Sequence, residues 1–295
     1  MRIINAHVHM IEADAMFKGG DTITLPGGVS VLREIKQTLP LLSPDVLLEQ
    51  MDEADIETAV LYAVDAPIVY ASNQYVQELC NKYPERLMGF ASVNPLAADA
   101  ADTLENAVEK MNMRGLKLHP PLQGFAPDDE RVFPVYDKAQ ELGLPVVFHV
   151  GSTPFGSMCR LKYADPLKVD DVAVNFPDLP IMLTHLGTLW HNEAFMVVEK
   201  NPNVFIDTAG YLNEICKILT PEIISRIGSD KIIFGTDYPM PYGAEKHRMK
   251  DFVDCIRKLE VSEHNLQNIF ADNFERLLKG RFETTQTLSI DDLSK

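Results

Sequence analysis

The sequence predicts an α/β fold with one large domain, a (β/α)₈ or TIM barrel. Eight short apolar runs alternate with longer stretches of helical spacing, and the 295 residues suit the usual length of such a barrel. Polar residues gather at the C-terminal ends of the runs, which in a barrel converge on one mouth. No run is followed by a GxGxxG turn, which argues against an open, doubly wound nucleotide-binding sheet.

The predicted strands are short runs of β-branched and other apolar residues. They cover residues 2–9, 57–65, 86–94, 113–119, 144–150, 180–185, 203–208 and 231–237. The polar side chains at or near their ends are those of His7, His9, Asp65, Asn94, Lys117, His119, His149, His185, Asp207 and Asp237.

Helices are predicted at 44–54, 67–82, 98–112, 130–142, 165–176, 244–260 and 262–279. The first has a clear start, because Ser43 precedes Pro44 and Asp45. Residues 10–42 and 151–164, after the first and fifth strands, are too long for simple turns, and we expect lid and specificity loops there. The barrel domain is expected to span 1–280, with a polar C-terminal extension at 281–295.

Composition and charge narrow the class of partner. The chain has 27 basic and 43 acidic residues, and its net charge of −16 disfavours nucleic acid and anionic membranes as partners. No apolar run reaches the roughly 18 residues that a membrane helix needs, and no signal segment is recognisable, so a cytoplasmic location is expected. Cys80, Cys159, Cys216 and Cys255 are far apart and are expected to be reduced thiols. The expected partners are a small-molecule substrate and, in a homodimer, a second copy of the chain.

His7 and His9 should point to one place, because alternate side chains of a strand share a face. His149 and Asp237, at the ends of the fifth and eighth strands, would complete a set of three imidazole nitrogens and a carboxylate. This set suits one divalent metal ion, with Zn²⁺ favoured and Mn²⁺ or Fe²⁺ as alternatives. Each residue alone could be a hydrogen-bonded polar group of the barrel mouth, so the prediction depends on their joint position.

Asp237 and His185 are the predicted catalytic residues. A carboxylate that touches both a metal and its bound water can accept the proton of that water, and a histidine beside it can act as a general acid or base. His185 could instead be a further nitrogen ligand or a structural histidine. The residue types alone leave these alternatives open.

Lys117, His119, Gln123 and Arg160 are predicted to bind substrate or to support the metal ligands. Lys117 would point into the barrel, where a buried ammonium needs an anionic partner or a lowered pKa. A carboxylated Lys117 that bridges a second metal is the less favoured alternative. His119 precedes Pro120 and could serve only to shape its loop, and Arg160 could be a solvated surface residue.

In order and context, the motifs of the chain resemble the amidohydrolase superfamily. They are NAHVH, GLKLHPPLQGF, VVFHVG, LTHLG, IIFGTDYP and NIFADNFERLL, and they extend over nearly the whole chain. The resemblance is to the amidohydrolase-related branch that holds aminocarboxymuconate semialdehyde decarboxylase, γ-resorcylate decarboxylase and lactone hydrolases. It implies that His7, His9, His149 and Asp237 bind metal and that His185 positions or activates water. Lys117 matches a lysine that is carboxylated in dinuclear members, although one metal is more usual in this branch.

The expected function is that of a metal-dependent hydrolase, in which metal-activated water attacks a small carboxylated or cyclic ester, lactone or amide. The alternative is a nonoxidative decarboxylase of an aromatic or muconate-type carboxylic acid, which the same ligands could serve. A barrel that binds a metal or metabolite without turnover is a third hypothesis, disfavoured by the presence of both His185 and Asp237. Fold and ligands do not select the reaction, because the loops at the mouth do so.

Overall fold

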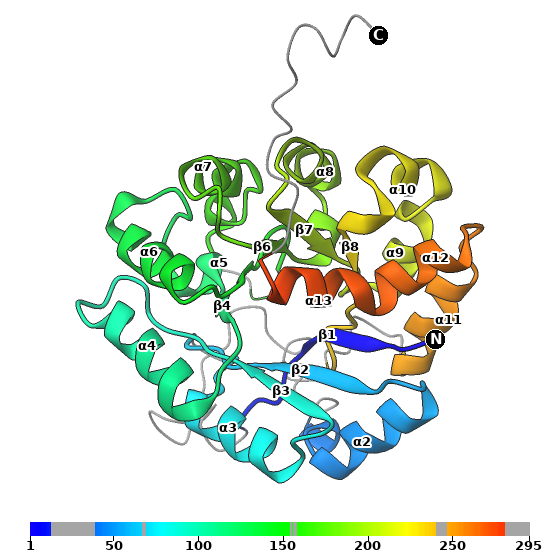
Figure 1. The fold of residues 1–295 in the computed structure, drawn as a ribbon, viewed down its shortest axis with the longest axis horizontal. Helices are drawn as coiled ribbons and strands as arrows, with labels where there is room; N and C mark the ends of the chain where they lie inside the picture. Colours follow the sequence, from blue (N-terminus) through cyan, green and yellow to red (C-terminus); the bar gives the residue numbers. More distant parts are fainter. Residues whose placement is uncertain (13–38, 67–68, 154, 156–157, 240–246, 281–295) are drawn as a thin grey trace, which may run out of the picture.

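The computed structural model describes residues 1–12, 39–66, 69–153, 155, 158–239 and 247–280, and shows parallel strands surrounded by helices (Figure 1). All eight predicted strands are present and lie within their predicted ranges. They are β1 (Ile4–Val8), β2 (Thr58–Tyr62), β3 (Leu87–Phe90), β4 (Leu116–Leu118), β5 (Val146–Phe148), β6 (Ile181–Leu183), β7 (Val204–Asp207) and β8 (Ile232–Ile233).

The strands form two parallel sheets in chain order, β1 to β3 and β4 to β8. Parallel bridges join the two sheets at both edges, one between Ala91 and Leu116 and one between Val8 and Tyr238. Backbone hydrogen bonds continue the pairing, with the Lys117 amide donating to Ala91 at 2.7 Å and the Ala6 amide donating to Phe234 at 2.9 Å. The eight strands therefore close into the predicted barrel.

Most of the helices form an outer layer around the strands, whereas α13 lies across one end of the barrel (Figure 1). The helices are α2 (Pro44–Glu53), α3 (Asn73–Lys82), α4 (Ala100–Met111), α5 (Pro120–Gln123), α6 (Phe133–Glu141), α7 (Leu167–Asn175), α8 (His191–Lys200), α9 (Leu212–Ile218), α10 (Pro221–Ile227), α11 (Met249–Arg257), α12 (Glu263–Gln267) and α13 (Asn273–Leu278). The predicted helix at 262–279 is divided by a π-helical segment, Asn268–Asp272. No predicted range corresponds to α5, α8, α9 or α10.

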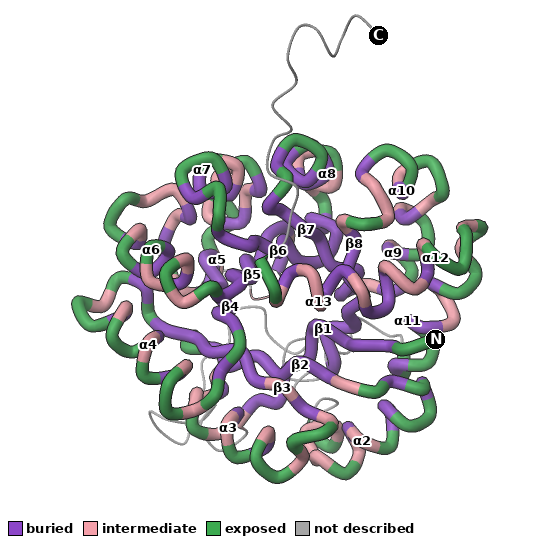
Figure 2. The backbone as a smooth tube through the Cα atoms, viewed as in Figure 1, coloured by how far each residue is buried: buried purple, intermediate pink, exposed green. Residues whose placement is uncertain are grey.

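Apolar side chains pack in two layers, because alternate strand residues face opposite sides of the barrel wall. On β2, Ala59 and Leu61 belong to the cluster that includes helix residues, whereas Val60 and Tyr62 belong to a second cluster with residues of other strands, such as Phe205. The second cluster fills the barrel interior and includes Phe274 and Leu277 of α13. Figure 2 accordingly shows buried strands and exposed outer faces of the helices.

The prediction of four reduced thiols is wrong for one pair. Cys216 of α9 and Cys255 of α11 form a disulfide with a Cα–Cα distance of 6.1 Å, while Cys80 and Cys159 are free. The two helices pack together although 39 residues separate the cysteines, so the pairing is invisible in the local sequence. None of the described helices is long and apolar enough to cross a membrane. The extension 281–295 and most of the loop predicted at 10–42 lie outside the described residues.

Candidate metal centre and active site

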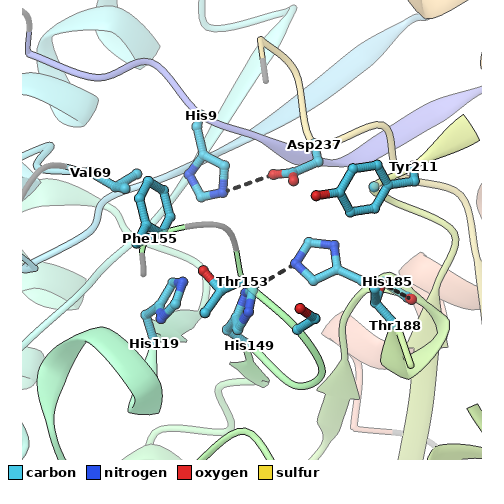
Figure 3. Close-up of a pocket in the computed structure, with 12 residues that line it drawn as sticks. His9, Val69, His119, His149, Thr153, Phe155, His185, Thr188, Tyr211 and Asp237 are labelled. Carbon is cyan, nitrogen blue, oxygen red and sulfur yellow. Dashed lines mark hydrogen bonds and ion pairs between the residues drawn. The ribbon is translucent and has the colours of Figure 1, made fainter. Parts of the chain in front are cut away.

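A cavity opens at the C-terminal ends of the strands (Figure 3). This is the end of the barrel at which the sequence predicts the site. The lining residues come mainly from the segments after β1, β4, β5, β6, β7 and β8. They are His9, Val69, His119, His149, Ser152, Thr153, Phe155, His185, Thr188, Gly210, Tyr211 and Asp237.

Three predicted metal ligands meet at one point. The Nε2 atoms of His7 and His9 are 3.1 Å apart, and Oδ1 of Asp237 lies 3.2 Å from the first and 3.3 Å from the second. Ligands about 2.0–2.1 Å from a tetrahedral metal are separated by roughly 3.3 Å, so these three atoms have the spacing of three ligands around one ion. The donor set therefore fits a divalent cation, as the HxH spacing predicts.

Asp207 fixes the orientation of His7, a role that the predicted site did not include. Its Oδ2 lies 2.7 Å from Nδ1 of His7, and its Oδ1 accepts hydrogen bonds from the amides of His185 and Ala209 at 2.7 and 3.1 Å. A carboxylate on one ring nitrogen holds the proton there and leaves the other nitrogen free for a metal. The sequence feature that could have identified Asp207 as a site residue is its position at the end of a predicted strand.

His149 lies beside the three-ligand cluster and contacts His185. Its Nδ1 is 3.1 Å from Nε2 of His185, and its own Nε2 is buried without a hydrogen-bond partner among the described residues. Two groups of potential ligand atoms within 4.8 Å of one another are found there, His7 with His9 and Asp237, and His7 with His185 and Asp207. His149 is in neither group, so its role as a ligand stays a prediction.

Two pocket residues have unusual backbone conformations. The φ angles of His185 and Asp237 are 63° and 59°, in the left-handed region, which typically costs a non-glycine residue about 1 kcal/mol or more. Hydrogen bonds hold both in place, because the His185 amide donates to Asp207 and the Asp237 amide donates to the carbonyl of His7 at 3.0 Å. Strain of this kind gathers at functional sites, which favours functional roles for both residues.

Burial keeps the cavity histidines neutral. It lowers the pKa of His9 and of His185 to about 4 and lowers the pKa of His149 well below its ordinary value. The neutral imidazole is the form that can bind a metal. These three residues would therefore be ready to act as metal ligands at neutral pH.

The carboxylates have the opposite effect on His7. Burial and the nearby Lys117 charge lower its pKa, but Asp207 and Asp237 outweigh them, so that the pKa is raised. Burial would raise the pKa of Asp237, yet the charge and hydrogen bonding of His7 and His9 keep this pKa well below its usual value. The carboxylates of Asp207 and Asp237 thus favour positive charge beside His7, as a cation site requires.

Lys117 lies inside the barrel and does not line the cavity. Its Nζ is 5.0 Å from the centre of the Tyr62 ring and has no hydrogen-bond partner among the described residues. Burial lowers the pKa of Lys117 to about 8, although Asp207 and Asp237 oppose this effect. The position of Lys117 inside the barrel therefore does not support the predicted contact between Lys117 and the substrate.

Two other predicted substrate-binding residues also lie outside the cavity wall. Gln123 links the loops after β2 and β3 by hydrogen bonds, because its side-chain amide donates to the carbonyls of Asp65 and Val93 at 3.2 and 2.8 Å. The side chain of Arg160 is exposed to solvent. His119 does line the cavity, and its ring stacks on His149 with the centroids 3.9 Å apart and 10° between the planes.

The remaining cavity wall comes from residues that the sequence did not single out. Phe155 and Val69 are its apolar members, and hydroxyl groups come from Ser152, Thr153, Thr188 and Tyr211. Figure 3 shows the Tyr211 hydroxyl directed into the cavity. Their loops carry no periodic pattern, so only the general expectation of a specificity loop at 151–164 pointed to any of them.

A family model described as "Amidohydrolase" matches residues 4–280. The chain belongs to the amidohydrolase family. Among curated relatives of this amidohydrolase, γ-resorcylate decarboxylase of Polaromonas sp. strain JS666 is 25% identical over 289 residues, covering 76% of this chain and 86% of the relative. The 2-amino-3-carboxymuconate-6-semialdehyde decarboxylase of Dictyostelium discoideum is 21% identical over 277 residues, covering 78% and 75%. The relatives are enzymes.

A solved structure supports the same fold for this amidohydrolase. It is a dihydroxybenzoic acid decarboxylase of Polaromonas sp. strain JS666 with bound manganese and the inhibitor 2-nitroresorcinol. It matches this chain with a TM-score of 0.70 and 18% identity, over 94% of this chain and 97% of that chain. The predicted membership of the superfamily and the predicted barrel are both confirmed.

Proposed function

We propose that this amidohydrolase is a metal-dependent, nonoxidative decarboxylase of a small aromatic carboxylic acid. The observation that carries the proposal is that both curated relatives described above are decarboxylases and align with most of this chain. They favour the decarboxylase alternative over the hydrolase that the sequence motifs led us to expect. The cluster of His7, His9 and Asp237 supplies the metal site that either reaction needs.

We assign the metal to His7, His9 and Asp237, with His149 as the proposed fourth ligand. When bound, the ion supplies positive charge that holds and polarises a substrate oxygen. Histidine and carboxylate ligands suit both Mn²⁺ and Zn²⁺. Manganese is the metal in the solved relative, and we propose it for this protein in place of the expected zinc.

Decarboxylation requires a proton at the carbon that carries the carboxylate. The bond between this carbon and the carboxylate breaks, carbon dioxide leaves, and the added proton takes its place. We assign proton delivery to Asp237, which is ionised in the free protein and first takes up a proton that comes from water. We propose His185 as the group that exchanges protons with it, because both side chains line the cavity. The apolar side chains of Phe155 and Val69 would contact the aromatic ring and exclude water from it. The homodimer and the cytoplasmic location stay predictions.

The test is a panel of hydroxybenzoates labelled with ¹³C in the carboxyl group, together with lactones and esters, assayed with the manganese-loaded protein. We expect labelled carbon dioxide from at least one acid, and a loss of at least about 100-fold in rate in Asp237→Asn. His264→Asn is the matched control, because His264 is exposed on α12, outside the cavity. Hydrolysis of a lactone or ester without release of carbon dioxide would overturn the proposal. We also propose that 2-nitroresorcinol binds this cavity, as it binds the solved relative.

A further inference from the structure

His119 is held rigidly at the edge of the cavity. It directly follows β4 and is the N-terminal cap of α5, where its carbonyl accepts hydrogen bonds from the amides of Leu122 and Gln123 at 3.0 and 2.9 Å. Its own amide donates to Oε1 of Gln123 at 2.8 Å. The neighbouring Pro120 restricts the backbone further. The ring therefore has little freedom to reorient when a ligand enters, which lowers the entropic cost of a contact with it.

The hydrogen bonding of His119 determines which ring nitrogen carries the proton. Nδ1 accepts a hydrogen bond from the amide of Leu122 at 3.4 Å, so its lone pair is used. A neutral imidazole that accepts through Nδ1 must carry its proton on Nε2, which then can only donate. The hydrogen bond at Nδ1 is the one that the ring of His119 makes with the described residues, and the ring lines the cavity.

The stack of His119 on His149 places this donor at the cavity wall, beside the proposed metal site. Figure 3 shows the two rings side by side below Phe155. A planar ligand that contacts Phe155 and reaches the metal would therefore pass the edge of His119. Asp65 and Val93 accept hydrogen bonds from the Gln123 amide, which connects the position of His119 to the loops after β2 and β3.

We propose that His119 is a specificity-determining residue whose Nε2–H donates a hydrogen bond to an oxygen substituent on the ring of a hydroxyaryl acid, separate from the oxygen held by the metal. This inference rests on the proposed function and deepens it. The substrate carries a second ring oxygen, and an otherwise identical acid without this oxygen is a poor substrate. Gln123 is the positioning residue for His119.

The test is a cycle of two ligands and two proteins. The dissociation constants of 2-nitroresorcinol and of 2-nitrophenol, which lacks one hydroxyl group, are measured with the manganese-loaded wild type and His119→Phe. Phenylalanine keeps a ring for stacking on His149 and removes the donor. We expect the wild type to prefer 2-nitroresorcinol by about 10-fold or more, the value of one buried hydrogen bond. His119→Phe should lose this preference and keep its metal.

Two further variants separate recognition from a structural effect. In His119→Gln an amide can donate from nearly the same place, and we expect part of the preference to return. Gln123→Leu removes the hydrogen bonds that hold His119 in position. We expect its preference for 2-nitroresorcinol over 2-nitrophenol to fall while its metal content stays unchanged. Both ratios compare two ligands on one protein, so a general loss of stability would not alter them.

The proposal is overturned if the wild type binds both ligands equally, if His119→Phe keeps the preference, or if that variant loses its metal and binds both ligands equally weakly. The last result would mean that His119 acts only by supporting His149. NMR of the imidazole nitrogens provides an independent readout, because we expect a proton on Nε2 of His119 and none on Nδ1. Absence of carbon dioxide release with an intact ligand preference would refute the proposed reaction and leave the role of His119 standing.

Discussion

Replacing Lys117 with methionine should stabilise the metal-free protein. The ammonium is buried without a hydrogen-bond partner among the described residues, and burial lowers its pKa from 10.5 to about 8. Each pKa unit corresponds to about 1.4 kcal/mol, so the charged form costs the folded state about 3 kcal/mol at pH 7. Methionine is unbranched and adaptable enough to fill the same space without a charge. We therefore expect Lys117→Met to raise the unfolding free energy by up to about 3 kcal/mol at pH 7.

The gain should depend on pH in a defined direction. Since the folded pKa of Lys117 is below the unfolded value, the unfolded wild type binds more protons between pH 8 and 10.5. The stability of the wild type should therefore rise with pH through this window, and the advantage of Lys117→Met should shrink toward zero. Lys231, whose pKa burial also lowers to about 8, is common to both proteins, so its effect cancels in their difference.

Urea denaturation after removal of metal by a chelator, at pH 7 and pH 10, measures this difference. A variant less stable than the wild type at pH 7, or an advantage that does not change with pH, would refute the reasoning and show that Lys117 has an anionic partner. Metal analysis of the same proteins tests the less favoured carboxylated lysine. In that case the wild type would hold two ions and Lys117→Met would hold fewer.

Three further substitutions test the ligand support, the chemistry and the loop packing. Asp207→Asn should weaken metal affinity by about 10- to 100-fold in a chelator competition, and unchanged affinity would contradict its orienting role. Asp237→Asn should lose at least about 100-fold in turnover, with part of its metal retained, and full activity would exclude it as the proton carrier. Gly151 has φ of 85°, and a Cβ there would lie 2.7 Å from the Thr188 carbonyl oxygen. Gly151→Ala should therefore lower Tm more than Gly124→Ala, where φ is 78° and a Cβ would meet nothing within 4 Å. Equal decreases in Tm would mean that the loops of Gly151 and Thr188 move apart to accommodate the added methyl group.

Much of the fold could be predicted because barrel strands have a local signature. Each strand is buried, so its residues read as a short apolar run whatever its neighbours are. The sequence pattern did not predict α8, α9 or α10. Two of these helices, α9 and α10, have only seven residues each, which gives a weak periodic signal. The predicted helix at 262–279 is one pattern in the sequence but is interrupted at Asn268–Asp272 by a π-helical turn.

The sequence by itself determined the barrel, the family and the pairing of His7 with His9, because strand periodicity alone places two side chains of one strand on one face. Only the tertiary structure decided how Asp207 holds His7 and that Lys117 lies inside the barrel without lining the cavity. It also decided that His119 lines the cavity whereas Arg160 does not. Barrel closure sets these contacts, since it brings together strand ends that are far apart in the chain. The disulfide between Cys216 and Cys255 has the same origin, because helix packing and not sequence spacing brings the two sulfur atoms together.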